Sequence, residues 1–355
     1  MSQLLNSLGA DAHVRSSFEP FARQRLSLGR VCRVDRGAYR TLIESGQEIR
    51  AEPTGNLLYR TGNLADLPVV GDWVALEISG DRVVVHGLLP RRTAFYRRAP
   101  GSPERRQVLV ANIDFVLIVC GLDGDFNLRR IERYLTLVQA SGASAVIALN
   151  KTDLCRNIAD RLQMVDAVAG AAPVIVIQAN LASGIEPVRS FLQFGQTIAL
   201  LGSSGAGKST LANHLLESEC QPTAPPSWGN GKGRHTTTSR QLFPLPTGGA
   251  LIDTPGLREL QLWATSENLD TSFEDVFEIQ ARCRFRDCSH QSEPGCAIRA
   301  ALLEGSLDPG RWQNYLKLRR EVRHHEIAAD EVSARMEKQR WKRIHKTFRN
   351  HDKHR

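Results

Sequence analysis

One short motif restricts the fold of this chain more than any other feature. Residues 202–209 read G-S-S-G-A-G-K-S and match the pattern G-x-x-x-x-G-K-[ST] in full. The motif follows an apolar run at Thr197–Leu201 and precedes STLANHLL, a segment of helical character. A glycine-rich loop between a strand and a helix turns its backbone N–H groups inward and surrounds a phosphate. The motif therefore predicts an α/β sheet with a phosphate-binding loop at the carboxyl end of one strand.

Other apolar, β-branched runs fit the same sheet. They lie at Asp114–Cys120, Ala145–Asn150, Val174–Ala179 and Ala250–Asp253. Between the first two, Arg129–Ser141 carries apolar residues at helical spacing. Apolar strands that alternate with helices indicate a parallel sheet covered on both faces. The motifs below all stand where one of these strands ends.

A second motif predicts which base is bound. Residues 150–153 read N-K-T-D and close a strand. The carboxylate of Asp153 can accept hydrogen bonds from guanine N1–H and N2–H, a donor pair that adenine lacks. We expect Asn150 to support the loop and the base edge, and the stem of Lys151 to cover the ring. The next strand ends in Q-A-N, where we expect the backbone N–H of Ala179 to reach guanine O6.

A third motif completes a nucleotide site. Residues 253–256 read D-T-P-G and also end a strand. We expect Lys208 to bridge the β- and γ-phosphates, and Ser209, Asp253 and Thr237 to bind Mg²⁺. The N–H of Gly256 can sense the γ-phosphate. The predicted GTP-binding residues are Asn150, Lys151, Thr152, Asp153, Ala179, Gly202, Ser203, Ser204, Gly205, Ala206, Gly207, Lys208, Ser209, Thr210, Asp253 and Gly256.

The order of these motifs is permuted. Ordinary GTPases run from the phosphate loop through the switch threonine and D-x-x-G to N-K-x-D. Here N-K-T-D at 150 precedes the phosphate loop at 202, the threonine cluster at 236 and D-T-P-G at 253. A cut and rejoined sheet leaves each strand end in place, so the chemistry is kept. The γ-phosphate-sensing segment then leads directly into the C-terminal region, which can receive its movement.

The residues that activate water are less well defined. Leu257 follows D-T-P-G where Ras-like GTPases carry a water-orienting glutamine, so we expect slow intrinsic hydrolysis. His235, beside Thr236–Thr238, is the candidate to supply the missing group. A loop histidine among basic residues can equally contact RNA phosphate, and this alternative stays open. The predicted catalytic residues are His235, Lys208 and Thr237.

The N-terminal quarter has a different pattern of apolar and polar residues. Residues 1–25 show no strong pattern and are expected to form a mobile arm. Five short alternating runs follow within 26–103: GRVCRVD, YRTLIES, QEIRAEP, GDWVALEIS and DRVVVHGLL. Short strands separated by turn residues suit a small closed barrel of the OB type. Such barrels commonly bind oligonucleotides, although the fold alone does not establish that role.

A Cys/His cluster indicates a metal. Cys283, Cys288, His290 and Cys296 lie within fourteen residues and can close a tetrahedral site for one structural Zn²⁺. A set of reduced core thiols is the alternative. The net charge of +8 is concentrated in residues 335–355, where nine basic residues face two acidic ones. Such a block fits a polyanion partner such as nucleic acid, or a solvated tail.

Other broad classes are disfavoured. The chain has no run of 18 or more apolar residues, and its N-terminus lacks the features of a secretory signal. Seven cysteines in 355 residues do not make a disulfide framework. We therefore expect a cytoplasmic protein without a membrane span, and a monomer.

With these motifs in this order, the chain resembles the ribosome small-subunit-dependent GTPase A (RsgA) family of circularly permuted GTPases. The resemblance spans 29–318 and also rests on G-D-W at 71–73, G-R-H-T-T-T at 233–238 and E-P-G at 293–295. It implies a GTP hydrolase that forms GDP and phosphate in late maturation of the 30S subunit, where it contacts 16S rRNA. Hydrolysis would be stimulated by the subunit and coupled to release.

The expected fold is multidomain. An OB-type barrel at 26–103 precedes a permuted α/β GTPase domain at 104–265 and a helical zinc-binding domain at 266–320. A basic tail, helical or disordered, occupies 321–355. Two other function classes fit parts of the sequence: a GTP-binding, rRNA-contacting scaffold with little hydrolysis, and a P-loop ATPase or kinase. The intact Lys208, Ser209, Asp253 and Asp153 disfavour a decayed site, and N-K-T-D disfavours ATP.

Overall fold

The computed structural model describes residues 4–55, 57, 64–99, 102–217, 240–253, 265–324 and 326–327. The chain forms two compact units, Met1–Arg97 with Arg106–Gln261, and Arg98–Arg105 with Leu262–Arg355. His235, Thr237 and Gly256, with the other residues of the threonine cluster and the basic tail at 335–355, lie outside the described residues.

The barrel has the five strands that the sequence predicts. They are β1 Ser27–Asp35, β2 Ala38–Ile43, β3 Glu48–Pro53, β4 Trp73–Ser79 and β5 Arg82–Leu88. The strands follow the order β1-β2-β3-β5-β4, and a further β1–β4 pairing closes the ring. Val31, Val74, Leu76 and Val85 fill its interior and are fully buried. The alternating pattern of each strand therefore turns its apolar face inward.

The α/β sheet also follows the prediction. Its parallel strands are β8 Phe115–Gly121, β9 Ser144–Asn150, β10 Val174–Val176, β11 Thr197–Leu201 and β13 Ala250–Asp253, in the order β10-β9-β8-β11-β13. A further strand, β12 Gln241–Pro244, pairs antiparallel with β13. Since the first five strands are parallel, their carboxyl ends meet at one edge.

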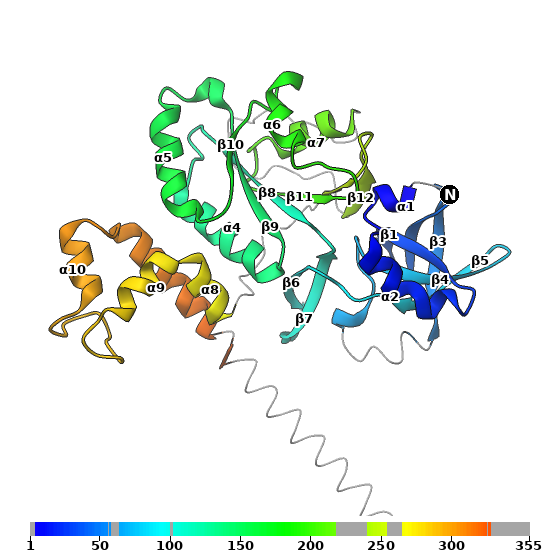
Figure 1. Cartoon of the computed structure of the whole chain (residues 1–355), viewed down its shortest axis with the longest axis horizontal. Coiled ribbons are helices and arrows are strands. Elements are labelled where there is room, and N and C mark those ends of the chain that lie inside the picture. The colour runs from blue at the N-terminus through cyan, green and yellow to red at the C-terminus, as the bar shows by residue number, and fades with distance from the viewer. Residues whose placement is uncertain are drawn as a thin grey trace, which may run out of the picture. The chain divides into compact units, whose positions relative to one another are not determined.

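Helices cover both faces of this sheet (Figure 1). They are α4 Leu128–Ser141, α5 Ile158–Ala169, α6 Glu186–Arg189 and α7 Lys208–Leu216. Helices α6 and α7 share one apolar cluster with Leu117, Val119 and Ile198. Because side chains alternate along a strand, Ile118 points to the opposite face, where it lines a pocket with Ile131 of α4.

The N-terminal segment differs from the expected mobile arm. It contains α1 Leu4–Ser7 and α2 Ala12–Ala22, and Leu5 and Leu8 are fully buried. The carbonyl of Ser7 accepts from the N–H groups of Gly195 (3.2 Å) and Gly249 (2.7 Å), which belong to turns of the α/β sheet. These residues therefore have regular structure and buried contacts in place of the expected mobile arm. These short helices bury their few apolar side chains through tertiary contacts, so the local pattern is weak.

Two features join the barrel to the α/β sheet. Strand β1 pairs with β12 at Arg33 and Gln241, so one eleven-stranded sheet runs through both. Buried Arg30 donates to the carbonyls of Leu8, Gly71 (3.3 Å) and Asn112 (3.0 Å) and to Thr197 Oγ1 (2.8 Å). Its guanidinium lies over the Trp73 ring. Burial lowers the pKa of Arg30 to about 10.

The G-D-W motif at 71–73 lies at this junction. Gly71 has a φ of +93°, and a Cβ there would overlap the carbonyl of Ala111. The Asp72 carboxylate is fully buried and accepts from Arg91 at 2.7 and 2.8 Å. The G-D-W motif therefore has a structural role in this chain.

The structure also contains a hairpin that the sequence did not predict, formed by β6 Ala94–Ala99 and β7 Ser102–Ala111.

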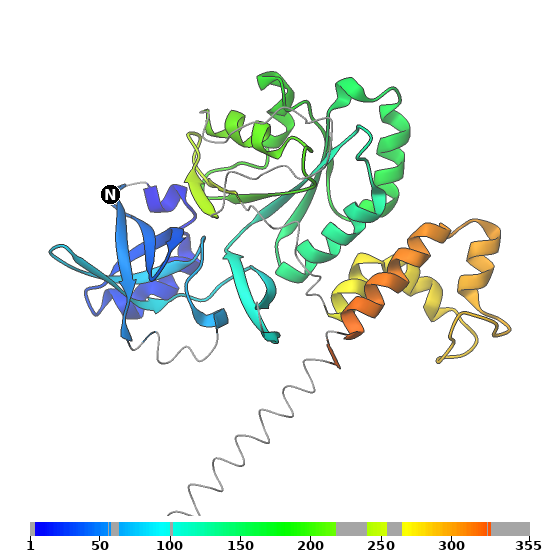
Figure 2. The same cartoon turned by 180° about the vertical axis from the view of Figure 1, so that it is seen from behind.

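The second unit is helical (Figure 2). It contains α8 Ser266–Ser272, α9 Glu274–Ala281, α10 Ala297–Glu304 and a helix over 309–324. Phe273 and Tyr315 pack against each other, with ring centroids 5.5 Å apart. Arg311 holds the Asp275 carboxylate at 2.5 and 2.7 Å. None of the helices in the described ranges, in either unit, has the length and apolar character that crossing a membrane requires.

Candidate functional site

The predicted nucleotide motifs meet at the carboxyl edge of the parallel sheet. Strand β11 lies between β8 and β13, and β9 follows β8. The register places Gly121 opposite Asn150 at the ends of β8 and β9. The phosphate loop after Leu201 and the carboxylate of Asp253 therefore follow neighbouring strands. The permuted order does not separate the described parts of these motifs in space.

The phosphate loop needs its glycines for close packing. A Cβ at Gly202 would overlap the carbonyl oxygen of Val119, and one at Gly207 would overlap the amide of Asn150. Gly207 also has a φ of +99° and caps the N-terminus of α7. Ser209 and Thr210 thus lie in the first turn of that helix. Lys208 Nζ donates to the carbonyls of Gly202 (2.9 Å) and Ser203 (2.5 Å) at the start of the loop.

Asn150 joins the separate motifs. Its Nδ2 donates to the carbonyl of Ala206 in the phosphate loop at 2.8 Å. Its Oδ1 accepts from the backbone N–H of Ala179 at 2.9 Å. The side chain is 2% exposed, so both hydrogen bonds are shielded from water. The expected support of the loop by Asn150 is present, and it links segments 56 and 29 residues away.

The base-reading residues follow directly. Lys151 adopts a left-handed conformation with φ +63°, and a 3₁₀ turn, η2, covers Thr152–Leu154. Within that turn Asp153 is exposed, as a group that meets a ligand must be. Lys151 Nζ contacts Asp123 Oδ2 at 2.5 Å. The turn therefore presents Asp153 outward while Lys151 is held by a neighbouring loop.

Ala179 differs in detail from the prediction. Its N–H was expected to reach the base, whereas in the structure it donates to Asn150 Oδ1. The loop after β10 is closed by a hydrogen bond from Gln178 N to the carbonyl of Gly184 at 3.0 Å. A 3₁₀ turn, η3, follows at Ala182–Ile185. Gln178 stands where GTPases usually have serine, and its backbone N–H thus closes this loop.

Three residues at the carboxyl edge of the sheet were not predicted from the motifs. Asp123 and Asp125 lie in the loop between β8 and α4, and Arg130 lies on α4. Arg130 pairs with the Asp125 carboxylate at 2.8 and 2.9 Å, and Ser203 Oγ donates to the same carboxylate. The rule that ligand-binding residues follow parallel strands would have found both acids, because they come directly after a strand.

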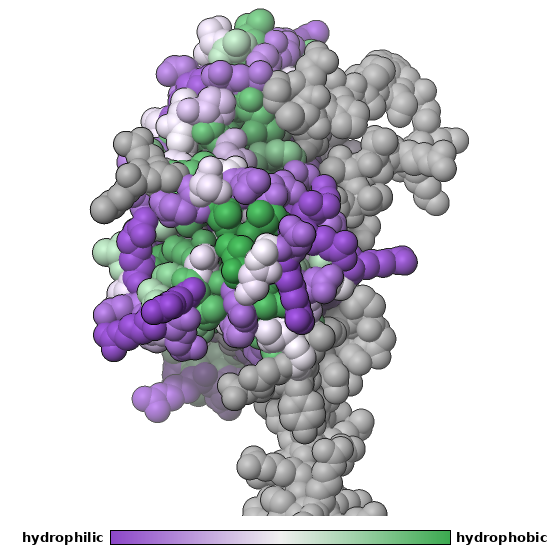
Figure 3. Space-filling view, turned by 90° about the vertical axis from the view of Figure 1, so that its right-hand side faces the viewer, coloured by the Kyte–Doolittle hydropathy of each residue, from purple (hydrophilic) through white to green (hydrophobic). Residues whose placement is uncertain are grey.

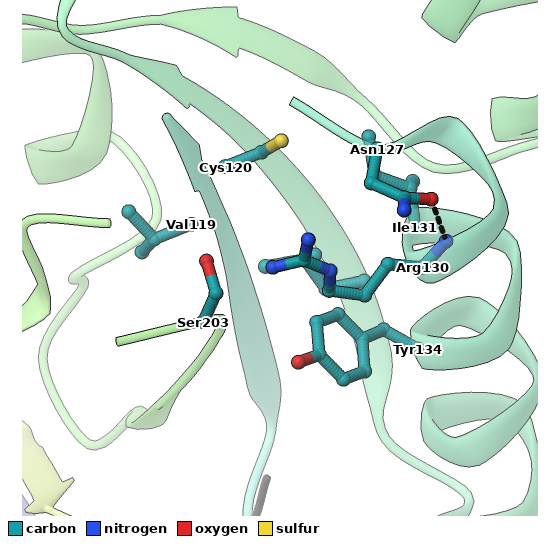
Figure 4. Close-up of a pocket in the computed structure, with 8 residues that line it drawn as sticks. Val119, Cys120, Asn127, Arg130, Ile131, Tyr134 and Ser203 are labelled. Carbon is teal, nitrogen blue, oxygen red and sulfur yellow. Dashed lines mark hydrogen bonds between the residues drawn. The ribbon is translucent and has the colours of Figure 1, made fainter. Parts of the chain in front are cut away.

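A pocket opens between β8, α4 and the phosphate loop. Figure 4 shows Arg130 extending from α4 toward Ser203, with Tyr134 one turn further along the helix. Cys120 and Asn127 complete this part of the lining. Burial raises the pKa of the Cys120 thiol, which therefore stays protonated at neutral pH.

The predicted metal ligands of the second unit lie together. The ligand atoms of Cys283, Cys288, His290 and Cys296 all lie within 4.8 Å of one another. His290 Nδ1 is 3.5 Å from both Cys283 Sγ and Cys296 Sγ. A tetrahedral zinc with bonds of about 2.0–2.3 Å requires ligand atoms this close. The donor set and its spacing therefore fit Zn²⁺.

The loop between the ligands is fixed by Glu293. Its carboxylate accepts from the N–H groups of Ser289 (2.8 Å), Gln291 (3.1 Å) and Ser292 (3.2 Å), and from Ser289 Oγ. These hydrogen bonds, led by that of the Ser289 side chain, lower the pKa of Glu293 to about 2. Glu293 thus supports His290, which holds a left-handed φ of +62°.

Comparison with known proteins gives consistent matches. Residues 88–263 match the profile of the family described as RsgA GTPase. A small ribosomal subunit biogenesis GTPase RsgA from Opitutus terrae is 48% identical and covers 96% of each chain. Its counterpart from Syntrophotalea carbinolica is 45% identical, over 96% of this chain and 98% of its own.

Solved structures show the same fold. YjeQ from Thermotoga maritima has a TM-score of 0.62 at 24% identity, over 84% of this chain and 98% of its own. YloQ, described as a circularly permuted GTPase, has a TM-score of 0.58 at 23% identity, over 84% and 96%.

The fold and the permuted motifs define a circularly permuted P-loop GTPase, a class of GTP hydrolases. Its N-terminal barrel and its helical region with a Cys₃His cluster complete the architecture predicted from the sequence. The chain belongs to the RsgA family, as the identity over nearly its full length shows.

Proposed function

We propose that this chain hydrolyses GTP in late maturation of the 30S ribosomal subunit, with hydrolysis stimulated by the subunit and coupled to release. The observation that carries the nucleotide part is Asn150, which ties the base-reading loop to the phosphate loop and to Ala179. The subunit part rests on relatives described as small ribosomal subunit biogenesis GTPases. GTP and GDP are the proposed ligands.

Each site residue has a proposed task. Asp153 would select guanine, and Lys208 would bridge the β- and γ-phosphates. Ser209 and Asp253, which follow neighbouring strands, would share Mg²⁺ with Thr237. Bound Mg²⁺ would neutralise charge on the phosphates. These assignments extend to Gly256 and the remaining residues of the phosphate loop as predicted from the motifs, whereas Ala179 would support the site through its hydrogen bond to Asn150 Oδ1.

The proposed water-activating residue is His235. Leu257 has no group that orients water, so the subunit-bound state would bring His235 into use. His235 lies outside the described residues, and its proposed role rests on the sequence pattern.

The proposed metal of the second unit is one structural Zn²⁺ held by Cys283, Cys288, His290 and Cys296. A site with four protein ligands leaves no position for a substrate, so the metal would stabilise the loop rather than react. Although burial opposes it, hydrogen bonds from the backbone of Ala297 and Ile298 lower the pKa of Cys283. A thiolate is the form that binds zinc.

The proposed partner surfaces are the barrel, the zinc-binding region and the basic tail, which would contact 16S rRNA. Figure 3 shows the barrel side of the molecule, where hydrophilic side chains project around a smaller hydrophobic area. Several arginines of the barrel strands pair with acids, such as Arg33 with Asp35 at 3.1 Å and Arg50 with Glu52 at 3.5 Å. A protein that acts on the 30S particle would be cytoplasmic, and we propose that it is a monomer.

Phosphate release measured with GTP and with ATP, with and without 30S particles, tests this function. We expect slow release from GTP alone, strong stimulation by 30S particles and no stimulated release from ATP. His235→Ala should lose the stimulated rate while GTP affinity stays nearly unchanged. Turnover that 30S particles do not change would refute the proposal and favour a GTP-binding scaffold.

A further inference from the structure

The loop between β8 and α4 contacts both halves of the nucleotide site. At one end Asp123 Oδ2 lies 2.5 Å from Lys151 Nζ of the base-reading motif. At the other end Asp125 accepts a hydrogen bond from Ser203 Oγ, in the phosphate loop. The backbone N–H of Asp125 donates to Asp123 Oδ1 at 3.1 Å, so the two acids form one connected unit. The loop therefore spans the distance between base and phosphate motifs.

Asp125 is held as an ionised acceptor. Arg130 Nη1 and Nη2 donate to its two carboxylate oxygens at 2.8 and 2.9 Å, and Nη2 also reaches its backbone carbonyl at 3.2 Å. Although burial opposes it, the hydrogen bonds from Arg130 and Ser203 lower the pKa of Asp125. An ionised carboxylate only accepts, so the Ser203 hydroxyl must donate to it. This fixes the orientation of that side chain.

Ser203 is thereby held on two sides. Its hydroxyl binds Asp125, while its backbone carbonyl accepts from Lys208 Nζ at 2.5 Å. A phosphate loop works by holding its backbone N–H groups in a fixed inward arrangement before the ligand arrives. An anchor on the second residue of the loop restricts that arrangement. Arg130 also offsets the negative charge that Asp125 would otherwise place beside a phosphate site.

We propose that Asp125, supported by Arg130, is a positioning residue for the phosphate loop, acting through Ser203, and that Asp123 is a positioning residue for Lys151. This inference rests on the proposed GTP site. A loop that only stabilised the turn before α4 would affect all ligands equally. The proposal instead assigns the phosphate-dependent part of binding to Asp125 and the base-dependent part to Asp123.

Affinities of the full-length chain for GDP and for GMP separate these parts, because GMP lacks the β-phosphate. We expect Asp125→Ala to lower GDP affinity about tenfold, the effect of losing one hydrogen bond to a charged group. GMP affinity should change much less, so the GDP-to-GMP affinity ratio falls. Asp123→Ala should lower both nucleotide affinities by a similar factor and leave their ratio unchanged, while the affinity for pyrophosphate, which has no base for Lys151 to cover, stays normal. Asp125→Glu, which keeps the carboxylate, should recover part of the loss.

Two controls sharpen the result. Asp35→Ala removes a carboxylate of similar exposure that also pairs with arginine, but in the barrel, and should leave both affinities unchanged. If Asp125 acts through Ser203, the double variant Asp125→Ala, Ser203→Ala should bind GDP as well as the single variant that has the lower GDP affinity.

Unchanged GDP affinity in Asp125→Ala would overturn the inference, as would an equal loss for GDP and GMP. If the losses of GDP affinity in Asp125→Ala and Ser203→Ala added in full in the double variant, Asp125 would not act through Ser203. If the unaltered chain did not bind GDP, the proposed function itself would be refuted. That result differs from one in which the unaltered chain and Asp125→Ala bind GDP equally well, which would refute only this inference.

Discussion

At the scale of single residues, Asn150 is closely surrounded in the nucleotide site. It is buried, it uses both ends of its amide on backbone groups, and Gly207 approaches it without room for a Cβ. The N-K-T-D motif alone predicts a supporting role for Asn150. The structure shows which two groups it supports, the Ala206 carbonyl and the Ala179 N–H.

Asn150→Ala should weaken GDP binding by about tenfold or more. The substitution leaves a buried carbonyl and a buried N–H without partners, and each such loss costs about 1–3 kcal/mol. Titration with a fluorescent GDP analogue measures the change. Leu154→Ala, at a side chain that is 60% exposed in the adjoining turn, is the control and should bind normally. An Asn150→Ala protein with normal affinity would contradict the bridging role.

Asp153→Asn should exchange GTP for xanthosine triphosphate as the preferred ligand. An amide can donate to the oxygen that xanthine carries at C2, where guanine carries an amino group, so the hydrogen-bond pattern is reversed. Competition of the two triphosphates for the variant measures the preference. A variant that still prefers GTP would show that the base is read by another group.

At the scale of elements, the segment from Cys283 to Cys296 has little apolar packing of its own. Its order comes from the metal ligands, from Glu293 and from Trp312, whose ring lies edge-on to His290 at 5.4 Å. A short loop of this kind gains most of its folding free energy from bound metal.

Removal of zinc should therefore disorder this loop and change the fluorescence of Trp312. The unaltered chain should contain one Zn²⁺, measured by elemental analysis, and a chelator should release it with a change in emission. In Trp312→Phe the emission change should disappear while the release of zinc persists. A chain without zinc after purification in its presence would contradict the assignment.

Glu293→Gln should speed the release of zinc to a chelator. A neutral amide oxygen accepts hydrogen bonds less strongly than the carboxylate, so the loop that carries His290 opens more often. A colorimetric chelator gives the rate. Asp287→Asn alters an exposed acid of the same segment and should release zinc at the normal rate. Equal rates in both variants would exclude a supporting role for Glu293.

At the scale of the whole molecule, the barrel and the α/β sheet belong to one compact unit. The β1–β12 pairing and the hydrogen bonds of Arg30 cross between them. The domain boundary predicted at 103/104 falls inside β7, and the barrel and the α/β fold share one continuous sheet. We expect these folds to unfold together.

Arg30→Met should lower the free energy of unfolding of this unit by about 2–4 kcal/mol, because buried carbonyls lose their donor. Urea unfolding followed by circular dichroism measures the change. Arg33→Met, on the same strand but with a side chain 33% exposed and paired with Asp35, should cost less than about 1 kcal/mol. Similar losses in both variants would argue against Arg30 as the main link.

The sequence by itself determined the parts of this protein that depend on contiguous residues. The phosphate loop, N-K-T-D and the Cys/His spacing each bring their groups together within a few residues, and the strands Thr197–Leu201 and Ala250–Asp253 end where predicted. The alternating and continuous apolar patterns also predicted the five-stranded barrel and the parallel sheet, since periodicity reflects which faces are buried.

Only the tertiary structure decided the contacts between distant segments. Arg30 reaches Thr197 across 167 residues, and Ser203 reaches Asp125 across 78. The helices at Leu4–Ser7 and Ala12–Ala22 likewise carry too few apolar residues to be predicted, and their buried side chains, Leu5 and Val14, depend on surfaces formed elsewhere in the chain. Such hydrogen bonds and burial depend on which strands become neighbours, and no local residue pattern specifies that arrangement.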